Sequence, residues 1–410
     1  MERKGEMSDE EVLSALMRGD LKMHEIERAV GGDVPRAVEL RRAFVERKTG
    51  KHLRNIGHFS FDAEMAMRRN IENMIGAAQI PMGVAGPLLC KGDASGEFFI
   101  PLATTEGALV ASVNRGCAAI NRSGGAYAFV IADGMTRAPV FRANSVQDAI
   151  NAVNFIRDNE DKMREIAEST SKHLKLKEIQ PFFVGRNVFL RFVCETGDAM
   201  GMNMVTIATD EVSSFIEEHT SLRSVAISGN VCVDKKPSAV NLILGRGKTV
   251  IADVFLRDDV VEDVLKTTKD AMFEVVMRKC FVGSAFSSSL GFNAHFANII
   301  AAIFIATGQD VAHTVEGSLG FTTAEVEEGG IHFAVTLPSL QVGTVGGGTS
   351  LGTQREALDI MGVSGSGSPE GSNARKFAAI VACAVLAGEI SLIAAIAARH
   401  LTQAHMRLNR

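Results

Sequence analysis

Residues 1–71 alternate apolar and charged positions at helical spacing. Ser8 and Glu11 form a capping-box pattern before the apolar run VLSALM, and a Gly-Gly pair at 31–32 separates further amphipathic segments. This pattern predicts a small helical N-terminal domain over 1–71.

From residue 72 the sequence becomes rich in glycine, proline and small apolar residues. EFFIPLA is typical of a strand, and the periodicity that follows predicts a helix over 105–120. After residue 239 come two apolar runs that we interpret as strands, AVNLIL and TVIADVFL, followed by the apolar helix NAHFANIIAAIFIATG and a long terminal helix. We predict that 72–138 and 239–410 form one large domain.

The stretch 139–226 has its own compact pattern of predicted helices and strands. A helix is predicted from SVQDAINAVNFIRDN onward, then the alternating strand FFVGRNVFLRFVC, the turn TGDAMG, a helix through EVSSFIEEH and a strand-like SVAIS. We predict a small α+β domain inserted into the large one, with 227–238 as a connecting loop. The fold class expected for the whole chain is α+β.

One segment, 377–398, has a single charge, Glu389, and is long enough as a helix to cross a bilayer. A charge at the centre of a membrane helix is costly, and no second comparable stretch exists in the sequence. We therefore favour a buried core helix over a membrane span.

Composition narrows the function classes. A chain of 410 residues is longer than a single hydrophobic core usually supports, so we expect two or three domains. The net charge of −5 provides no basic surface to attract nucleic acid. The six cysteines form no C-x-x-C pair, which favours a reducing compartment and argues against structural zinc. The charged start MERKGEMSDEE lacks the apolar segment of a secretory signal, so we expect a cytoplasmic protein.

The common nucleotide-binding motifs fail here. GRGKT would need a glycine at the position of Leu242 to complete a phosphate-binding loop, and neither glycine-rich stretch gives G-x-G-x-x-G. TGDAMGMNMV, at 196–205, leaves two interpretations open. Its glycines suit a helix start that binds a pyrophosphate, but an Asp cap on a Met-rich core helix has the same pattern.

SGNVCVDKKPS places Asp234, Lys235 and Lys236 side by side among small apolar residues. If this stretch is a strand, alternation points Lys235 opposite to its two neighbours. A buried Lys235 would need a carboxylate, and Glu106 and Asp310 are the best candidates. A solvated charge cluster before Pro237 is the alternative.

Other candidates also have structural alternatives. Glu106 precedes a helix, where the dipole favours a carboxylate, and Asp310 follows a buried apolar helix. His405, five residues before the last residue of the sequence, would ordinarily be an inert tail histidine.

Taken together, these stretches resemble the catalytic region of the class I 3-hydroxy-3-methylglutaryl-CoA (HMG-CoA) reductases. The match covers about four fifths of the chain, the first 70 residues fitting only loosely, and its motifs run in order: ENMIGAAQIPMGVAGPL, PLATTEGALVASVNRGCAAI, DGMTR, GRNVFLRF, TGDAMGMNM, SGNVCVDKKPSAVN, GRGK, GFNAHFANI, GQD, GTVGGGT, LAGEISLIAA and QAHM.

The resemblance implies reduction of HMG-CoA by two NADPH to mevalonate and CoA, through a thiohemiacetal and mevaldehyde. Glu106 then supplies protons to the carbonyl, Lys235 stabilises the oxyanion, Asp310 couples to both, and His405 protonates the departing thiolate.

The resemblance also implies binding residues. The substrate set is Arg137, Ser228, Asp234, Lys236, Lys279 and Asn298. The CoA set is Ser112, Asn114, Arg115 and Lys266. The cofactor set is Ser171, Lys172, Asp198, Met200, Gly201, Met202 and Asn203. Lys172 replaces the family's usual arginine, and a cation there suits the 2′-phosphate of NADPH.

Family members share a helical N-terminal domain, a large domain around a long central helix and a ferredoxin-like inserted domain. Their active sites form between subunits, which implies at least a homodimer and makes a homotetramer plausible. The sequence shows neither a membrane-anchoring region nor the phosphorylatable serine of animal enzymes, as in archaeal members. Two alternatives stay open: another NADPH-dependent CoA-thioester or aldehyde reductase with this fold, and a non-catalytic CoA-binding homologue, which the intact catalytic set disfavours.

Overall fold

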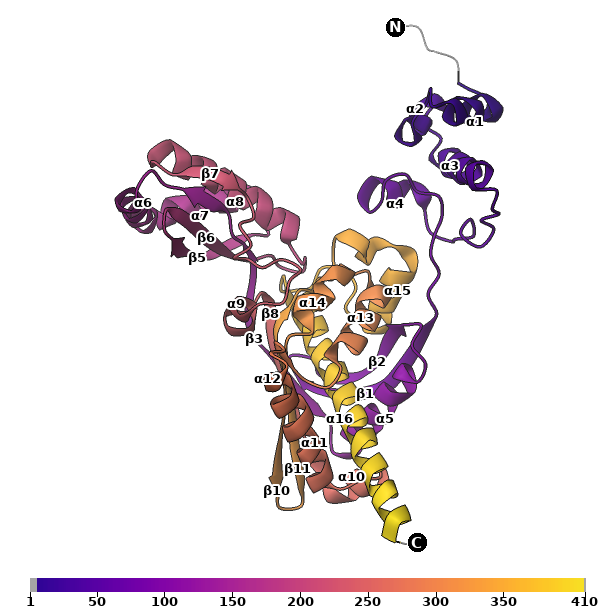
Figure 1. The fold of residues 1–410 in the computed structure, drawn as a ribbon, viewed down its shortest axis with the longest axis vertical. Helices are drawn as coiled ribbons and strands as arrows, with labels where there is room; N and C mark the ends of the chain where they lie inside the picture. Colours follow the sequence, from indigo (N-terminus) through magenta and orange to yellow (C-terminus); the bar gives the residue numbers. More distant parts are fainter. Residues whose placement is uncertain (1–5, 409–410) are drawn as a thin grey trace.

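The computed structural model describes residues 6–408, with side chains through residue 399. The fold is mixed α+β (Figure 1). The strands are β1 (Met82–Gly92), β2 (Gly96–Ala103), β3 (Ala126–Arg137), β4 (Val140–Arg142), β5 (Lys175–Val184), β6 (Asn187–Glu195), β7 (Arg223–Ala226), β8 (Gly247–Arg257), β9 (Gly291–Phe292), β10 (Gly320–Glu327) and β11 (Gly330–Leu340).

The α-helices are α1 (Asp9–Arg18), α2 (Ile26–Ala29), α3 (Val34–Thr49), α4 (Ala63–Arg69), α5 (Leu109–Arg122), α6 (Val146–Asp158), α7 (Glu160–Ser169), α8 (Met202–His219), α9 (Ala239–Leu244), α10 (Asp258–Asp263), α11 (Lys269–Val275), α12 (Ser284–Phe286), α13 (Phe296–Thr307), α14 (Thr314–Gly317), α15 (Gly352–Ile360) and α16 (Ser372–Leu408). The other helical segments are the 3-10 helices η1 (Met23–Glu25), η3 (Val311–His313) and η4 (Gly347–Ser350) and the π-helix η2 (Val276–Gly283).

Helices α1–α3 lie at the upper right of Figure 1, and α4 lies between them and α15, where Leu351 packs against the apolar cluster that contains Ala63 and Ala66. The predicted capping box starts α1: the Ser8 amide donates to Glu11 Oε2 at 2.8 Å, and the Glu11 amide donates to Ser8 Oγ at 3.4 Å. Val12, Leu16 and Ile26 belong to a small apolar cluster of these helices. The helical pattern predicted here is confirmed.

The largest apolar cluster surrounds α16, which runs along the mixed sheet (Figure 1). The residues 377–387 are fully buried, and so is Glu389. Among the described residues, α16 contains the one helix stretch long and apolar enough to span a membrane, and 83% of its most apolar window is buried inside the protein. The prediction of a core helix is therefore confirmed.

Helix α5 packs directly on α16. A Cβ added to Gly116 would overlap the carbonyl oxygen of Ala387, so a glycine is needed for the two backbones to approach this closely. This approach brings Ser112 and Arg115 against Ser391 of α16.

A second apolar cluster joins α6, α7 and α8 to β4, β5 and β6 at the upper left of Figure 1. Strand β3 links this part to the main sheet, because it pairs with β8 over Tyr127–Gly134 and with β6 over Met135–Arg137. Arg137 thus lies at the junction of the two parts.

Three local predictions are wrong. AVNLIL forms the helix α9, because Ser238 caps its start by accepting from the Asn241 amide and a six-residue apolar run has no decisive period. FFVGRNVFLRFVC is a hairpin of β5 and β6, which turns at Gly185 with φ 58°. Residues 227–238 form no strand, so the alternation argument for Lys235 does not hold.

Candidate active site

The loop 227–238 has an unusual backbone. Asn230, Val233 and Lys235 all have positive φ, at 62°, 46° and 59°, a backbone conformation that residues other than glycine rarely adopt. Two groups outside the loop hold it. Asn241 Nδ2 donates to the Val233 carbonyl at 3.0 Å, and the Lys235 amide donates to Glu316 Oε1 at 2.6 Å.

Lys235 and Asp310 form an ion pair with 2.8 Å between Nζ and Oδ2. The hydrogen bond that Lys235 donates to Asp310 raises the pKa of Lys235. Burial pushes the pKa of Asp310 upward, but the hydrogen bond from Lys235 and the proximity of His313 outweigh it, so this pKa is lowered. The pair is therefore charged at neutral pH. Since the two side chains are 43% and 37% exposed, a ligand can reach them.

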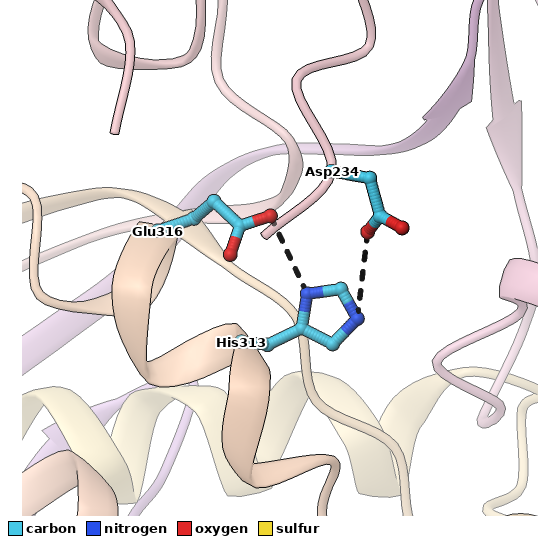
Figure 2. Close-up of side chains that lie close together, drawn as sticks. All are labelled: Asp234, His313 and Glu316. Atoms are coloured by element: carbon cyan, nitrogen blue, oxygen red, sulfur yellow. Dashed lines mark ion pairs between the residues drawn. The ribbon is translucent and has the colours of Figure 1, made fainter. Parts of the chain in front are cut away.

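A fully buried arginine lies behind this pair. Arg246 Nη2 is 3.0 Å from Asp234 Oδ1, and Nη1 is 3.0 Å from Glu316 Oε1. His313 sits between the two carboxylates, with Nδ1 3.4 Å from Glu316 Oε1 and Nε2 3.8 Å from Asp234 Oδ1 (Figure 2). Asp234, His313 and Glu316 offer ligand atoms within 4.8 Å of one another, as in a metal site. The Arg246 guanidinium already provides the positive charge that these carboxylates need.

No sequence motif pointed to Arg246, His313 or Glu316 as residues of this site. The signal that could have found the last two is spacing, because Asp310, His313 and Glu316 recur every three residues and so share one helical face. Arg246 lies about seventy residues from these partners and gave no local signal.

Glu106, the second expected partner of Lys235, lies with Asn298 instead. Asn298 Nδ2 donates to Glu106 Oε1 at 3.3 Å, and no hydrogen bond or ion pair joins Glu106 to Lys235 or Asp310 in the described part of the chain. The start of α13, which carries Asn298, is held by the buried Glu389, whose oxygens accept from the amides of Ala294 and His295 at 2.8 and 2.7 Å.

The predicted substrate residues divide into two groups. Arg137 approaches Asp234, with 3.9 Å between Nη1 and Oδ2, and its Nε donates to Thr206 of α8 at 3.0 Å. Lys236 Nζ donates to the Asp234 carbonyl at 3.3 Å. Further along, Ser228 Oγ lies 3.5 Å from Cys232 Sγ, while Lys279 is exposed in η2.

Most of the predicted CoA residues already have protein partners. Arg115 Nη2 donates to the Ser391 carbonyl at 2.6 Å, Ser112 Oγ donates to Ser391 Oγ at 3.0 Å, and Asn114 Oδ1 accepts from the Gly86 amide at 3.0 Å. Burial lowers the pKa of Arg115. Lys266 is exposed.

Among the predicted cofactor residues, Asp198 is buried and structurally committed. Its carboxylate accepts three backbone amides, from Gly367, Gly371 and Ala374, at 2.8 to 2.9 Å. It therefore holds the loop that leads into α16, so its side chain has little capacity left for a ligand.

The start of α8 is the open part of this region. Gly201 caps the helix at φ 87° with no side-chain hydrogen bond, and a Cβ there would overlap Thr196. Met200, Met202 and Asn203 flank it, and Met202 Sδ accepts from Arg246 Nη2 at 2.8 Å. Ser171 is half-buried, and Lys172 is exposed and forms no ion pair among the described residues. These residues fit a dinucleotide phosphate, because helix-start amides and a free cation both favour anions. The His405 side chain lies outside the described residues.

Comparison with known proteins supports the resemblance seen in the motifs. The family model described as hydroxymethylglutaryl-coenzyme A reductase matches residues 37–410. Curated relatives named 3-hydroxy-3-methylglutaryl-coenzyme A reductase include those of Pyrococcus abyssi, 55% identical over 98% of this chain and 100% of the relative, and Methanocaldococcus jannaschii, 54% identical over 98% and 99%.

The fold is also similar to that of a solved class II 3-hydroxy-3-methylglutaryl-CoA reductase from Streptococcus pneumoniae bound to NADPH. The TM-score is 0.64 at 18% identity, over 95% of this chain and 87% of the other. The family match extends into the N-terminal helices, further than the motifs did. The chain belongs to the hydroxymethylglutaryl-coenzyme A reductase family.

Proposed function

We propose that this protein reduces HMG-CoA to mevalonate and CoA with two NADPH, through a thiohemiacetal and mevaldehyde. The observation that carries the proposal is the charged Lys235–Asp310 pair, accessible to a ligand and backed by the buried Arg246. Both reduction steps place negative charge on the substrate carbonyl oxygen, and a fixed ammonium stabilises that charge.

The residues of the chain divide the remaining work. NADPH supplies the hydrides when bound. Lys235 holds the oxyanion, and Asp310 keeps the ammonium charged and oriented. Glu106, oriented by Asn298, provides the proton for the carbonyl oxygen, and His405 is the proton donor for the CoA thiolate.

Binding follows the positions of the other predicted residues. Arg137, Asp234 and Lys236 lie together. With Ser228 of the same loop and Lys279 of η2, they grip the hydroxymethylglutaryl end. Arg115, Ser112, Asn114 and Lys266 form the CoA side, where Arg115 and Ser112 require rearrangement or act through Ser391.

For NADPH we assign the pyrophosphate to the uncapped start of α8, at Met200–Asn203, and the 2′-phosphate to Lys172 with Ser171. Asp198 supports this site by fixing the 367–374 loop rather than by touching the cofactor.

We further propose the domain arrangement of the family: 1–71 helical, 72–138 with 239–410 as the large domain around α16, 139–226 as the inserted ferredoxin-like domain, and 227–238 as the connecting catalytic loop. The outer face of β1–β3 exposes apolar side chains that a second copy would cover, which supports a homodimer or homotetramer: Met82, Val84, Phe99, Tyr127, Phe129 and Ile131. We place the enzyme in the cytoplasm.

The deciding experiment is an NADPH-coupled assay at saturating HMG-CoA that counts cofactor oxidised per mevalonate formed. Two NADPH per mevalonate is the expected result. A panel of other acyl-CoA thioesters and aldehydes runs alongside. Robust turnover on another acyl group with none on HMG-CoA would contradict the proposal, and turnover on neither would favour a non-catalytic homologue.

A further inference from the structure

One short segment holds Lys235 at both ends. Asp310, at the start of η3, contacts the side-chain Nζ at 2.8 Å, and Glu316, in α14, accepts the backbone amide at 2.6 Å. The two carboxylates lie six residues apart, Asp310 as the cap of η3 and Glu316 in the α14 turn that follows it directly. The short stretch 310–316 therefore contacts both the backbone and the ammonium of this residue.

The backbone contact matters because Lys235 has φ 59°. A residue with a Cβ pays roughly 1 to 2 kcal/mol for this conformation, so the loop needs an external partner to keep it. Glu316 provides that partner, since its carboxylate reaches the amide directly.

Glu316 is itself fixed. Its side chain is fully buried, where an unpaired carboxylate would be costly, and the fully buried Arg246 neutralises it at 3.0 Å. The same guanidinium binds Asp234, the residue before Lys235, at 3.0 Å. His313 fills the space between the two carboxylates of the segment, with Nε2 3.6 Å from Asp310 Oδ2 and Nδ1 3.4 Å from Glu316 Oε1.

We infer that Glu316 is a positioning residue of the reduction, which sets the place of the Lys235 ammonium by holding its backbone amide. The inference rests on the proposed role of Lys235. Glu316 reaches the reaction only through Lys235, and a shift of about 1 Å in a catalytic group is enough to cost about 100-fold in rate.

Two substitutions separate the effect of the length of the Glu316 side chain from the effect of its charge. E316D keeps the charge that Arg246 needs but withdraws the carboxylate by one carbon–carbon bond, about 1.5 Å. E316Q gives up the charge but keeps an oxygen at the same reach. V315A alters an exposed side chain of the same helix and serves as the matched control. Each variant is assayed for kcat, for KM of HMG-CoA and of NADPH, and for its thermal unfolding midpoint.

We expect kcat of E316D to fall about 10- to 100-fold, with both KM values within about threefold of wild type. We expect kcat of E316Q to stay within about threefold of wild type, because its amide oxygen still accepts the Lys235 amide. Full activity of E316D, equal losses in E316D and E316Q, or a rise in KM in place of the fall in kcat would overturn the inference. The variant K235A distinguishes a failure of this inference from a failure of the proposed function. If K235A is inactive while E316D is fully active, the inference alone fails, whereas full activity of K235A removes the proposed function of Lys235 itself.

Discussion

The ammonium of Lys235 lies 2.8 Å from the carboxylate of Asp310, although the two residues are 75 positions apart in the sequence. Lys235 comes from a loop without regular structure, and Asp310 caps the start of η3. The contact joins the 227–238 loop to the segment that follows α13, and it places a fixed positive charge where a ligand can reach it.

Replacing Lys235 with alanine should lower kcat by about 100- to 1000-fold, for reduction of both the thioester and mevaldehyde, because each step loses its oxyanion partner. Substrate binding, measured by calorimetry, should be partly retained. K162A, which removes an exposed lysine of α7, is the control and should be fully active. Near-normal turnover of K235A would refute the assigned role.

The Lys235–Asp310 pair predicts a pH dependence of stability. The pKa of Asp310 is lowered from its ordinary 3.8, and that of Lys235 is raised from its ordinary 10.5. The contribution of the pair is therefore fully present between these two ordinary values. It is lost as the pH falls through the lowered pKa of Asp310 and as the pH rises through the raised pKa of Lys235.

Thermal unfolding of wild type and D310N across pH tests this dependence. The difference in midpoint should stay constant from pH 5 to pH 9 and shrink below about pH 4. It should correspond to no more than about 1 kcal/mol, because both side chains are partly exposed. D359N, at an exposed carboxylate with no ion pair in the described chain, should show no such difference. A difference that grows toward low pH would contradict the pairing.

Lys172 should select the cofactor. In K172A, KM for NADPH should rise about 10-fold while KM for NADH stays unchanged, since the two cofactors differ by the phosphate that the lysine would bind. K175A is the matched control, because Lys175 is exposed nearby but paired with Glu168. Equal losses with both cofactors would place Lys172 away from the 2′-phosphate.

Glu389 should be a strong determinant of stability. Besides the amides of Ala294 and His295, its carboxylate accepts the Thr322 hydroxyl at 2.6 Å. E389L leaves these three donors, one buried and two partly buried, without their acceptor and should lower the free energy of unfolding by about 3 to 5 kcal/mol. T322V removes one donor and should cost about 1 kcal/mol. Urea unfolding measures both, and equal stability of the two variants would show that the core tolerates the loss.

Gly116 should tolerate no side chain. G116A introduces a methyl group against the backbone of Ala387 and should cost about 1 to 3 kcal/mol, because α5 must move away from α16. Gly352, at the start of α15, has open space around its Cβ position, so G352A should change stability by less than about 0.5 kcal/mol. Thermal unfolding midpoints of the two variants measure the difference, and equal midpoints for G116A and G352A would contradict this prediction.

Local sequence patterns determined a large part of the fold. The Ser8 capping box was readable from the chain because it depends on residues three positions apart, and α16 was readable because 377–398 is apolar on all sides, which is typical of a buried helix. The need of Lys235 for a carboxylate was also readable, and Asp310 was one of the two candidates. The strand expected at AVNLIL failed because a short apolar run has no period that separates strand from helix.

Only the tertiary structure decided how the active-site loop is held. Positive φ at Lys235 depends on an acceptor 81 residues away, and the placement of Glu106 depends on Asn298, 192 residues away. The buried Arg246 is stable only because Asp234 and Glu316 meet it in space. Such contacts follow from how the sheet and α16 bring distant segments together, and no local pattern of residues contains that information.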